Sequence, residues 1–133
     1  MLTYLWVALG GALGSVARYW MTTVIVTLTG PLFPWGTIVI NIIGSFVIGL
    51  IAYATVPVGT VPISSDVRAF ILVGICGGYT TFSSFSIQTL ELARGGHWLY
   101  AGANIALSVV LCLLAVWAGY GLALLFGAPR IPD

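Results

Sequence analysis

The chain has 133 residues, of which 60% are hydrophobic and only 5% are charged. Soluble domains carry about 25% charged residues, so this composition excludes a soluble globular protein and a disordered chain, and it indicates a membrane protein. The formal net charge of +1, from four arginines, two aspartates and one glutamate, is too small to neutralise a run of phosphates, which excludes a nucleic-acid-binding protein.

Four apolar segments separated by turn-forming residues predict four membrane-spanning helices, each near the roughly 20 residues that a span requires. The breaks are a Pro- and Gly-rich turn at 30–36, a second one at 57–66 and a third at 94–98. The predicted helices cover about residues 2–27, 36–56, 67–92 and 98–126. Little chain remains outside them, so we expect a single all-α transmembrane domain over residues 1–133.

The first helix lacks a basic leading segment and a cleavage site, so we expect a retained span, and a protein of the bacterial inner membrane.

The two ends of the predicted bundle are evenly charged. Arg68 and Arg130 would share one side of the membrane, with Arg18 and Arg94 on the other. This balance leaves open whether the chain inserts in one orientation or in both. Four thin helices enclose little interior, so a polar path predicts a homodimer.

The first predicted helix combines small residues with one arginine. Gly10 and Gly14 have the spacing that allows close helix packing. Arg18 lies about 24 Å along the helix from Leu2, at 1.5 Å per residue, toward the far interface. Its guanidinium either reaches the lipid headgroups or forms a fixed positive charge at a vestibule that attracts anions.

Two of the predicted helices carry a stripe of polar or small residues at every fourth position, so these side chains share one face. The stripe of the second helix is Thr37, Asn41, Ser45 and Gly49, and that of the fourth is Tyr100, Asn104, Ser108 and Cys112. The amide of Asn41 offers two N–H donors well inside the span. A single such asparagine more often links helices, but two polar faces that meet would line a narrow path rich in uncharged donors.

The third predicted helix contains poor helix formers near its middle, GICGGYTTFSSFS over residues 74–86. Five serine and threonine hydroxyls fall within residues 80–86. We expect the helix to be broken here, and interrupted membrane helices often mark ion sites. Phe82 and Phe85 lie three residues apart and share a face, either as core aromatic residues or as part of such a site.

The chain lacks the groups that other transport and catalytic classes require. No acidic residue or lysine lies near the middle of a predicted span, which disfavours a proton relay or cation exchange. No nucleophile–base pair or metal-ligand cluster suggests an enzyme, and Cys76 and Cys112 are expected to be buried free thiols. A path of amide and hydroxyl donors and of phenyl edges, which carry partial positive charge, suits a small, strongly hydrated anion.

At these residues the sequence closely resembles the Fluc (CrcB) family of bacterial fluoride channels. The matching blocks are GGALGSVARY (10–19), PWGTIVINIIGSFVIG (34–49), GICGGYTTFSSFS (74–86) and YAGANIALS (100–108). The resemblance implies a passive channel that exports cytoplasmic fluoride. It also implies a dual-topology antiparallel homodimer with two pores.

The resemblance further implies roles for individual residues. Asn41 would be the pore asparagine, and Phe82 and Phe85 would line the ion path, one from each subunit in a given pore. A buried sodium ion at the dimer centre would be held by main-chain carbonyls near Gly77 and Thr80. Ser84 stands where the family often has threonine, and Asn104 where some members have a smaller residue. The polar path and vestibule residues would be Thr81, Ser84, Tyr100, Asn104, Ser108 and Arg18.

Two other classes fit part of the pattern. A coupled exporter of the small multidrug type also has four short helices and possible dual topology, but it needs a membrane carboxylate in its first helix, where this chain has none. A non-transporting membrane scaffold, or a subunit of a larger complex, would explain the small residues. It would not explain two polar stripes together with a hydroxyl-rich break in the third helix.

Overall fold

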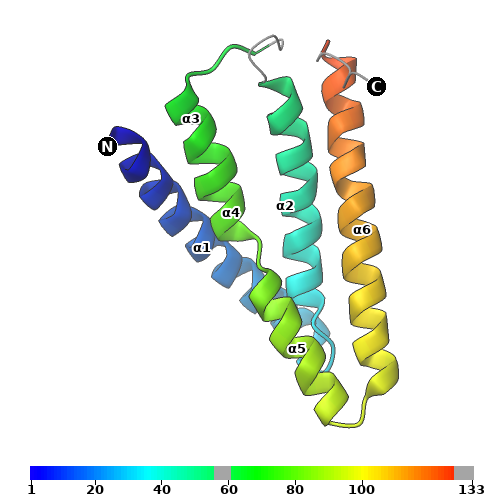
Figure 1. Cartoon of the computed structure of the whole chain (residues 1–133). Coiled ribbons are helices and arrows are strands. Elements are labelled where there is room, and N and C mark those ends of the chain that lie inside the picture. Colours follow the sequence, from blue (N-terminus) through cyan, green and yellow to red (C-terminus); the bar gives the residue numbers. More distant parts are fainter. Residues whose placement is uncertain (56–60, 128–133) are drawn as a thin grey trace.

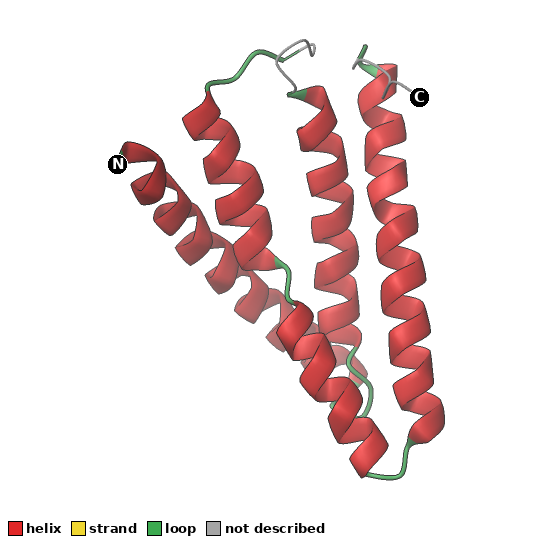
Figure 2. Cartoon of the chain, in the orientation of Figure 1, coloured by secondary structure: helices red, strands yellow, loops and turns green. Residues whose placement is uncertain are grey.

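The computed structural model describes residues 1–55 and 61–127 (Figure 1). Within these ranges all regular structure is helical and no strand occurs (Figure 2). The elements are α1 (Leu2–Thr29), α2 (Trp35–Ala54), α3 (Ser65–Ala69), the π-helical segment η1 (Phe70–Cys76), α4 (Gly77–Tyr79), α5 (Phe82–Arg94) and α6 (Trp98–Leu125). Arg130 and residues 57–60 of the predicted 57–66 turn lie outside the described residues.

Three helical segments of the described chain are long and apolar enough to cross a membrane: Trp35–Ala54, Ser65–Arg94 and Trp98–Leu125. The second of these comprises α3, η1, α4 and α5. Helix α1 is also long, with 28 residues, but it is less apolar because it contains Arg18 and several threonines. The fold is therefore that of an all-helical membrane protein.

Glycine and proline set the ends of the helices. Gly30 has a φ of 82°, in the left-handed region that favours glycine, and its N–H donates to the Val26 carbonyl at 2.9 Å, which ends α1. Pro34 directly precedes α2, where the missing N–H of proline costs nothing. Gly96, with a φ of 80°, makes the turn between α5 and α6. The turn-forming residues thus reverse the chain at each of these two ends.

Two pairs of elements pack through glycine. Helix α2 packs along α6, and α1 packs against η1 and α4 (Figure 1). A Cβ on Gly119 of α6 would lie 2.7 Å from the Leu50 nitrogen of α2, and one on Gly10 of α1 would lie 2.9 Å from the Gly74 Cα of η1. Backbone therefore meets backbone at both contacts, which only glycine permits.

The helical chain is interrupted between α4 and α5. Thr80 has φ −86° and ψ 159°, and Thr81 has φ −153° and ψ 118°, so both are extended. The Thr81 hydroxyl accepts a hydrogen bond from the Ser84 N–H at 3.2 Å and so caps the start of α5. The interruption falls within the hydroxyl-rich run of residues 74–86 and leaves peptide groups there without the usual helical partners.

Candidate ion pathway

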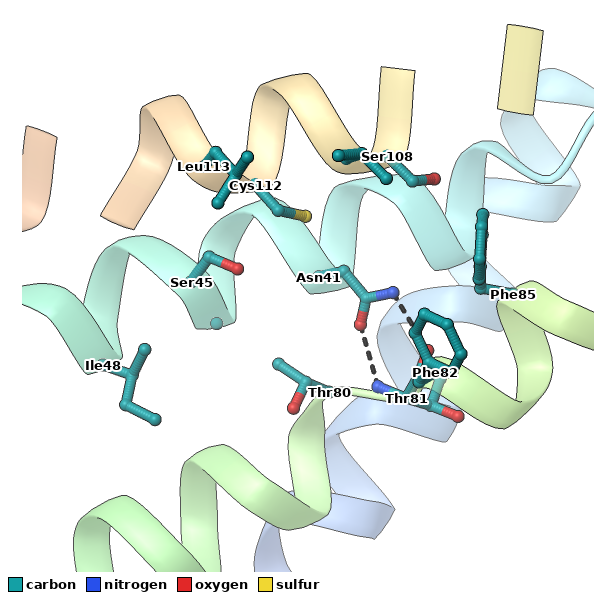
Figure 3. Close-up of a pocket in the computed structure, with 12 residues that line it drawn as sticks. Asn41, Ser45, Ile48, Thr80, Thr81, Phe82, Phe85, Ser108, Cys112 and Leu113 are labelled. Carbon is teal, nitrogen blue, oxygen red and sulfur yellow. Dashed lines mark hydrogen bonds between the residues drawn. The ribbon is translucent and has the colours of Figure 1, made fainter. Parts of the chain in front are cut away.

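A pocket of about 450 Å³ lies between α2, α6 and the interruption that leads into α5 (Figure 3). Polar lining comes from all three elements, with apolar side chains between. The lining residues are Asn41, Gly44, Ser45, Ile48, Thr80, Thr81, Phe82, Phe85, Ser108, Val109, Cys112 and Leu113. None of these described residues is charged, so the pocket offers hydrogen bonds without a fixed charge.

Asn41 is bonded to the backbone of the interruption in both directions. Its Nδ2 donates to the Thr81 carbonyl at 3.0 Å, and its Oδ1 accepts from the Thr81 N–H at 2.8 Å (Figure 3). The side-chain amide thus takes the place of a neighbouring peptide group, which satisfies both backbone groups of Thr81. This pair uses one of the two N–H bonds of the amide, and the other remains for a group in the pocket.

Hydroxyl groups surround Thr81. Its side chain is 8% exposed, and its Oγ1 donates to the Ser84 Oγ at 3.1 Å while accepting from the Ser84 N–H. The Ser83 hydroxyl lies 3.2 Å from the same Oγ1. Because each hydroxyl both donates and accepts, this cluster can rotate its protons toward an acceptor that enters the pocket.

Two phenyl rings cover one side of the pocket. The ring centroids of Phe82 and Phe85 are 5.1 Å apart, with 48° between the planes. Phe85 is half-buried, whereas Phe82 is 77% exposed. A large aromatic side chain beside a hydroxyl cluster is thus left open in the single chain.

The remaining residues predicted for the path are dispersed. Ser108 lines the pocket, 6% exposed, but Asn104 is fully buried behind it and donates from Nδ2 to the Thr89 hydroxyl at 2.8 Å. Tyr100 is 40% exposed and lies against Phe33, with ring centroids 5.9 Å apart. Ser84 and Arg18 are half-buried outside the lining. The pocket therefore unites Asn41, Thr80, Thr81, Phe82, Phe85 and Ser108.

Two polar lining residues were not among the predicted site residues. Ser45 follows Asn41 by one step of the α2 stripe, and Cys112 follows Ser108 by one step of the α6 stripe. The fourfold spacing that indicated the path was therefore a sufficient signal to find both. Cys112 is a free thiol and half-buried, while Cys76 is free and buried.

Gly77 is the first residue of the short α4, and Thr80 is the first residue of the interruption that follows it. In a continuous helix the Thr81 N–H would donate to the Gly77 carbonyl four residues earlier. Here that N–H donates to Asn41, so the Gly77 carbonyl lacks this donor. The Thr80 N–H and hydroxyl both donate to the Cys76 carbonyl, at 3.0 and 2.9 Å. No group of three or more His, Cys, Asp or Glu side chains that could hold a metal ion occurs within residues 1–55 and 61–127.

The fold and the pocket define the class first: an all-helical, multi-pass membrane protein with an uncharged, largely apolar pocket that holds amide and hydroxyl groups where helical structure is interrupted. Comparison with known proteins defines the family. The family model described as "CrcB-like protein, Camphor Resistance (CrcB)" matches residues 5–120. The chain belongs to this family, which confirms the family resemblance found in the sequence.

Several relatives carry the name of a channel rather than an enzyme. The chain is 60% identical over 119 residues to the "Fluoride-specific ion channel FluC" of Rhodospirillum rubrum, covering 90% of this chain and 92% of the relative. A protein of the same name from Paramagnetospirillum magneticum is 57% identical over 120 residues, covering 90% and 94%. Another from Methylocella silvestris is 52% identical over 120 residues, covering 90% and 92%.

Proposed function

We propose that the chain forms a passive, fluoride-selective channel that exports cytoplasmic fluoride across the bacterial inner membrane. The observation that carries this proposal is the pocket, whose described lining combines amide and hydroxyl donors with two phenyl rings and has no charged residue. Such donors replace part of the hydration shell of a small anion, and the lack of a fixed charge lets the ion leave. The names of the relatives support fluoride as the ion.

Asn41 is the central donor of the proposed path. The Thr81 backbone holds its amide in place. The second N–H of the amide is therefore already oriented before an ion arrives. The Thr81 hydroxyl donates to the Ser84 Oγ and the Ser108 hydroxyl to the Asn104 Oδ1, and each turns its proton toward the ion when the ion arrives. Phe82 and Phe85 contact the ion through their ring edges, which carry partial positive charge. Chloride, which is larger and less strongly hydrated, gains less from these amide and hydroxyl donors.

The conducting unit is an antiparallel homodimer with two pores. Each copy spans the membrane four times, because α1 crosses it in addition to the three apolar segments described above. The span formed by α3, η1, α4 and α5 is interrupted at Thr80 and Thr81. Support comes from the exposed Phe82 ring beside the hydroxyl cluster, because a second copy would cover it and complete the lining. In each pore one subunit contributes Phe82 and the other contributes Phe85.

The residues outside the pocket serve the approaches to it. Arg18 lies on α1 toward the end that joins α2 and supplies a fixed positive charge at a vestibule, which raises the local concentration of anions. Tyr100 and Asn104 continue the α6 stripe from Ser108 toward the start of that helix. Ser84 supports the path indirectly, through its hydrogen bonds to Thr81.

A structural sodium ion is held at the dimer centre by the carbonyls of Gly77 and Thr80 from both copies. These oxygen ligands fit such an ion, because hard cations prefer oxygen. The Gly77 carbonyl is available, since the Thr81 N–H that would donate to it in a continuous helix donates to Asn41 instead. A Cβ on Gly77 would meet no atom closer than 3.9 Å, so space is left on this side of the helix. The ion satisfies carbonyls that lipid cannot.

Ion efflux from liposomes that contain the purified chain tests the proposed function. We expect rapid fluoride efflux, read with a fluoride electrode, without a proton gradient and without accompanying chloride efflux. Fluoride efflux that requires a proton gradient would indicate a coupled exporter. A well-folded dimer that releases no fluoride under either condition would contradict transport altogether and leave the scaffold interpretation.

A further inference from the structure

Arg68 of α3 reaches across to the last turn of α2. Its Nη2 donates to the Ala52 carbonyl at 3.1 Å and its Nη1 to the Thr55 carbonyl at 3.4 Å. The last carbonyls of a helix have no intrahelical donor and carry its negative partial charge. The forked guanidinium therefore satisfies two of them at once, which a single ammonium does less well.

Two closely packed sets of elements dominate the described chain, and a smaller contact joins them where Thr22 of α1 meets Gly36 of α2. In one, α1 packs against the arm formed by α3, η1 and α4, with Thr3 donating to the Asp66 carboxylate at 2.6 Å and Gly10 against Gly74. In the other, α2 packs along α6 at Gly49 and Gly119. The arm has far less contact with α2 than with α1. In Figure 1 the arm diverges from α2 toward the end at which α1 begins.

In the part of the chain that the structure describes, two sets of side-chain hydrogen bonds join the arm and its Thr80–Thr81 extension to α2. One is the pair of Asn41 with Thr81 in the pocket, and the other is Arg68 at the end of α2. From residue 41 to residue 52 the helix rises about 16 Å. The side-chain hydrogen bonds between the arm and α2 therefore lie at two separated points, and packing of Gly44 against Thr80 lies near the first of them.

We propose that Arg68 is a positioning residue of the ion path, and this proposal rests on the proposed function. By holding the arm to the end of α2, Arg68 keeps the Thr81 backbone in register with the Asn41 amide. Loss of the fork lets the arm rotate about its packing on α1. The Asn41–Thr81 pair then lengthens, and the amide no longer presents its second N–H to the ion.

Side-chain amide signals in the NMR spectrum test this proposal directly. The chain has only two asparagines and one glutamine, so the side-chain amide region of the spectrum contains signals from three NH₂ groups. Arg68→Lys keeps the charge, and therefore the insertion bias, but loses the fork. We expect Arg68→Lys to move the Asn41 NH₂ signals while leaving unchanged those of Asn104, which bonds to Thr89 of α5.

Arg94→Lys is the matched control, because Arg94 is an exposed arginine at the end of α5. It should move neither asparagine. Arg68→Gln, if it folds, should shift the Asn41 signals further. If the spectral changes caused by Arg68→Lys are confined to residues near Ala52 and Thr55, the proposal is overturned. Such changes are what a purely local cap of α2 would produce.

Fluoride efflux gives the second readout. We expect Arg68→Lys to reduce the initial rate several-fold and Arg94→Lys to leave it unchanged. A normal rate in Arg68→Lys would also overturn the positioning role. If the wild-type chain itself released no fluoride, the proposed function would fail, whereas the NMR comparison would still decide whether Arg68 controls the geometry of Asn41.

Discussion

At the residue scale, the Asn41–Thr81 pair explains why a side-chain amide is needed at this depth. Thr81 is extended and directly precedes α5, so its N–H does not continue the helical pattern of α4, and lipid offers no substitute partner. An asparagine presents an acceptor and a donor side by side, as a peptide group does. It can therefore bond both groups of Thr81 and still direct one N–H into the pocket.

Replacing Asn41 by aspartate tests this role with almost no change in size. A carboxylate can still accept from the Thr81 N–H, but it cannot donate to the Thr81 carbonyl, and it places negative charge in the path of an anion. We therefore expect Asn41→Asp to abolish fluoride efflux from liposomes. Thr23→Val, which removes an exposed hydroxyl bonded within α1, is the control and should conduct normally. Normal flux in Asn41→Asp would disprove the assignment of the pore residue.

The two phenylalanines separate a conducting role from a packing role. Phe82→Ile and Phe85→Ile keep apolar bulk but remove the ring edge that would contact the anion. We expect both variants to lower fluoride efflux while the purified protein elutes unchanged in size-exclusion chromatography. Because Phe82 is 77% exposed in the single chain, its substitution should alter the stability of the isolated fold very little. Unchanged flux in both variants would mean that the rings only pack.

The sequence indicated the polar residues of the path better than it indicated their directions. Fourfold spacing placed Asn41 and Ser108 on stripes, and both line the pocket. Asn104 belongs to the same stripe as Ser108, yet it bonds to Thr89 behind the pocket. A fourfold step drifts by about 40° around a helix, so which members face the pocket depends on the neighbouring helix. Spacing alone does not contain that information.

At the element scale, glycine contacts determine how closely the helices pack. On α6, an added Cβ at Gly119 would lie 2.7 Å from the Leu50 nitrogen, whereas one at Gly121 would meet nothing within 4 Å. Gly119→Ala must therefore separate α2 from α6, with a cost of about 1–3 kcal/mol, typical of overpacking. Gly121→Ala gains helix propensity without a clash.

Thermal unfolding of the two variants in detergent measures this difference. We expect a lower melting temperature for Gly119→Ala and an equal or higher one for Gly121→Ala. The two substitutions are chemically identical and two residues apart on one helix. A melting temperature for Gly119→Ala equal to that of the wild type would show that α2 and α6 do not pack backbone to backbone there.

The elements also show where sequence patterns stop being informative. Gly30 and Gly96 marked turns because their left-handed φ values favour glycine. The π-helical hydrogen bonding of η1 (Phe70–Cys76) had no such signal. The hydrogen-bonding register of a helix depends on what packs against it, and here Gly74 of η1 lies against Gly10 of α1, a contact that no local propensity encodes.

At the scale of the whole molecule, composition was enough to identify a membrane protein but not to orient it. The four arginines divide evenly between the expected sides, so the positive-inside rule gives no preferred direction. Local patterns do not encode the assembly either, because an exposed ring such as that of Phe82 suits contact with lipid as well as with a second copy of the chain. Fluoride efflux through mixed dimers distinguishes these arrangements.

Dimers that contain one Asn41→Asp subunit and one wild-type subunit test the two-pore assembly. If each pore depends on Asn41 from one subunit only, the substitution blocks one pore and leaves the other open. We then expect a mixed dimer, isolated through a different affinity tag on each copy, to release fluoride at about half the wild-type rate. A single shared pore would instead place both Asn41 side chains on one path, and one carboxylate would stop conduction completely. Homodimers of each type, carrying the same pair of tags, set the two limits against which the mixed dimer is read.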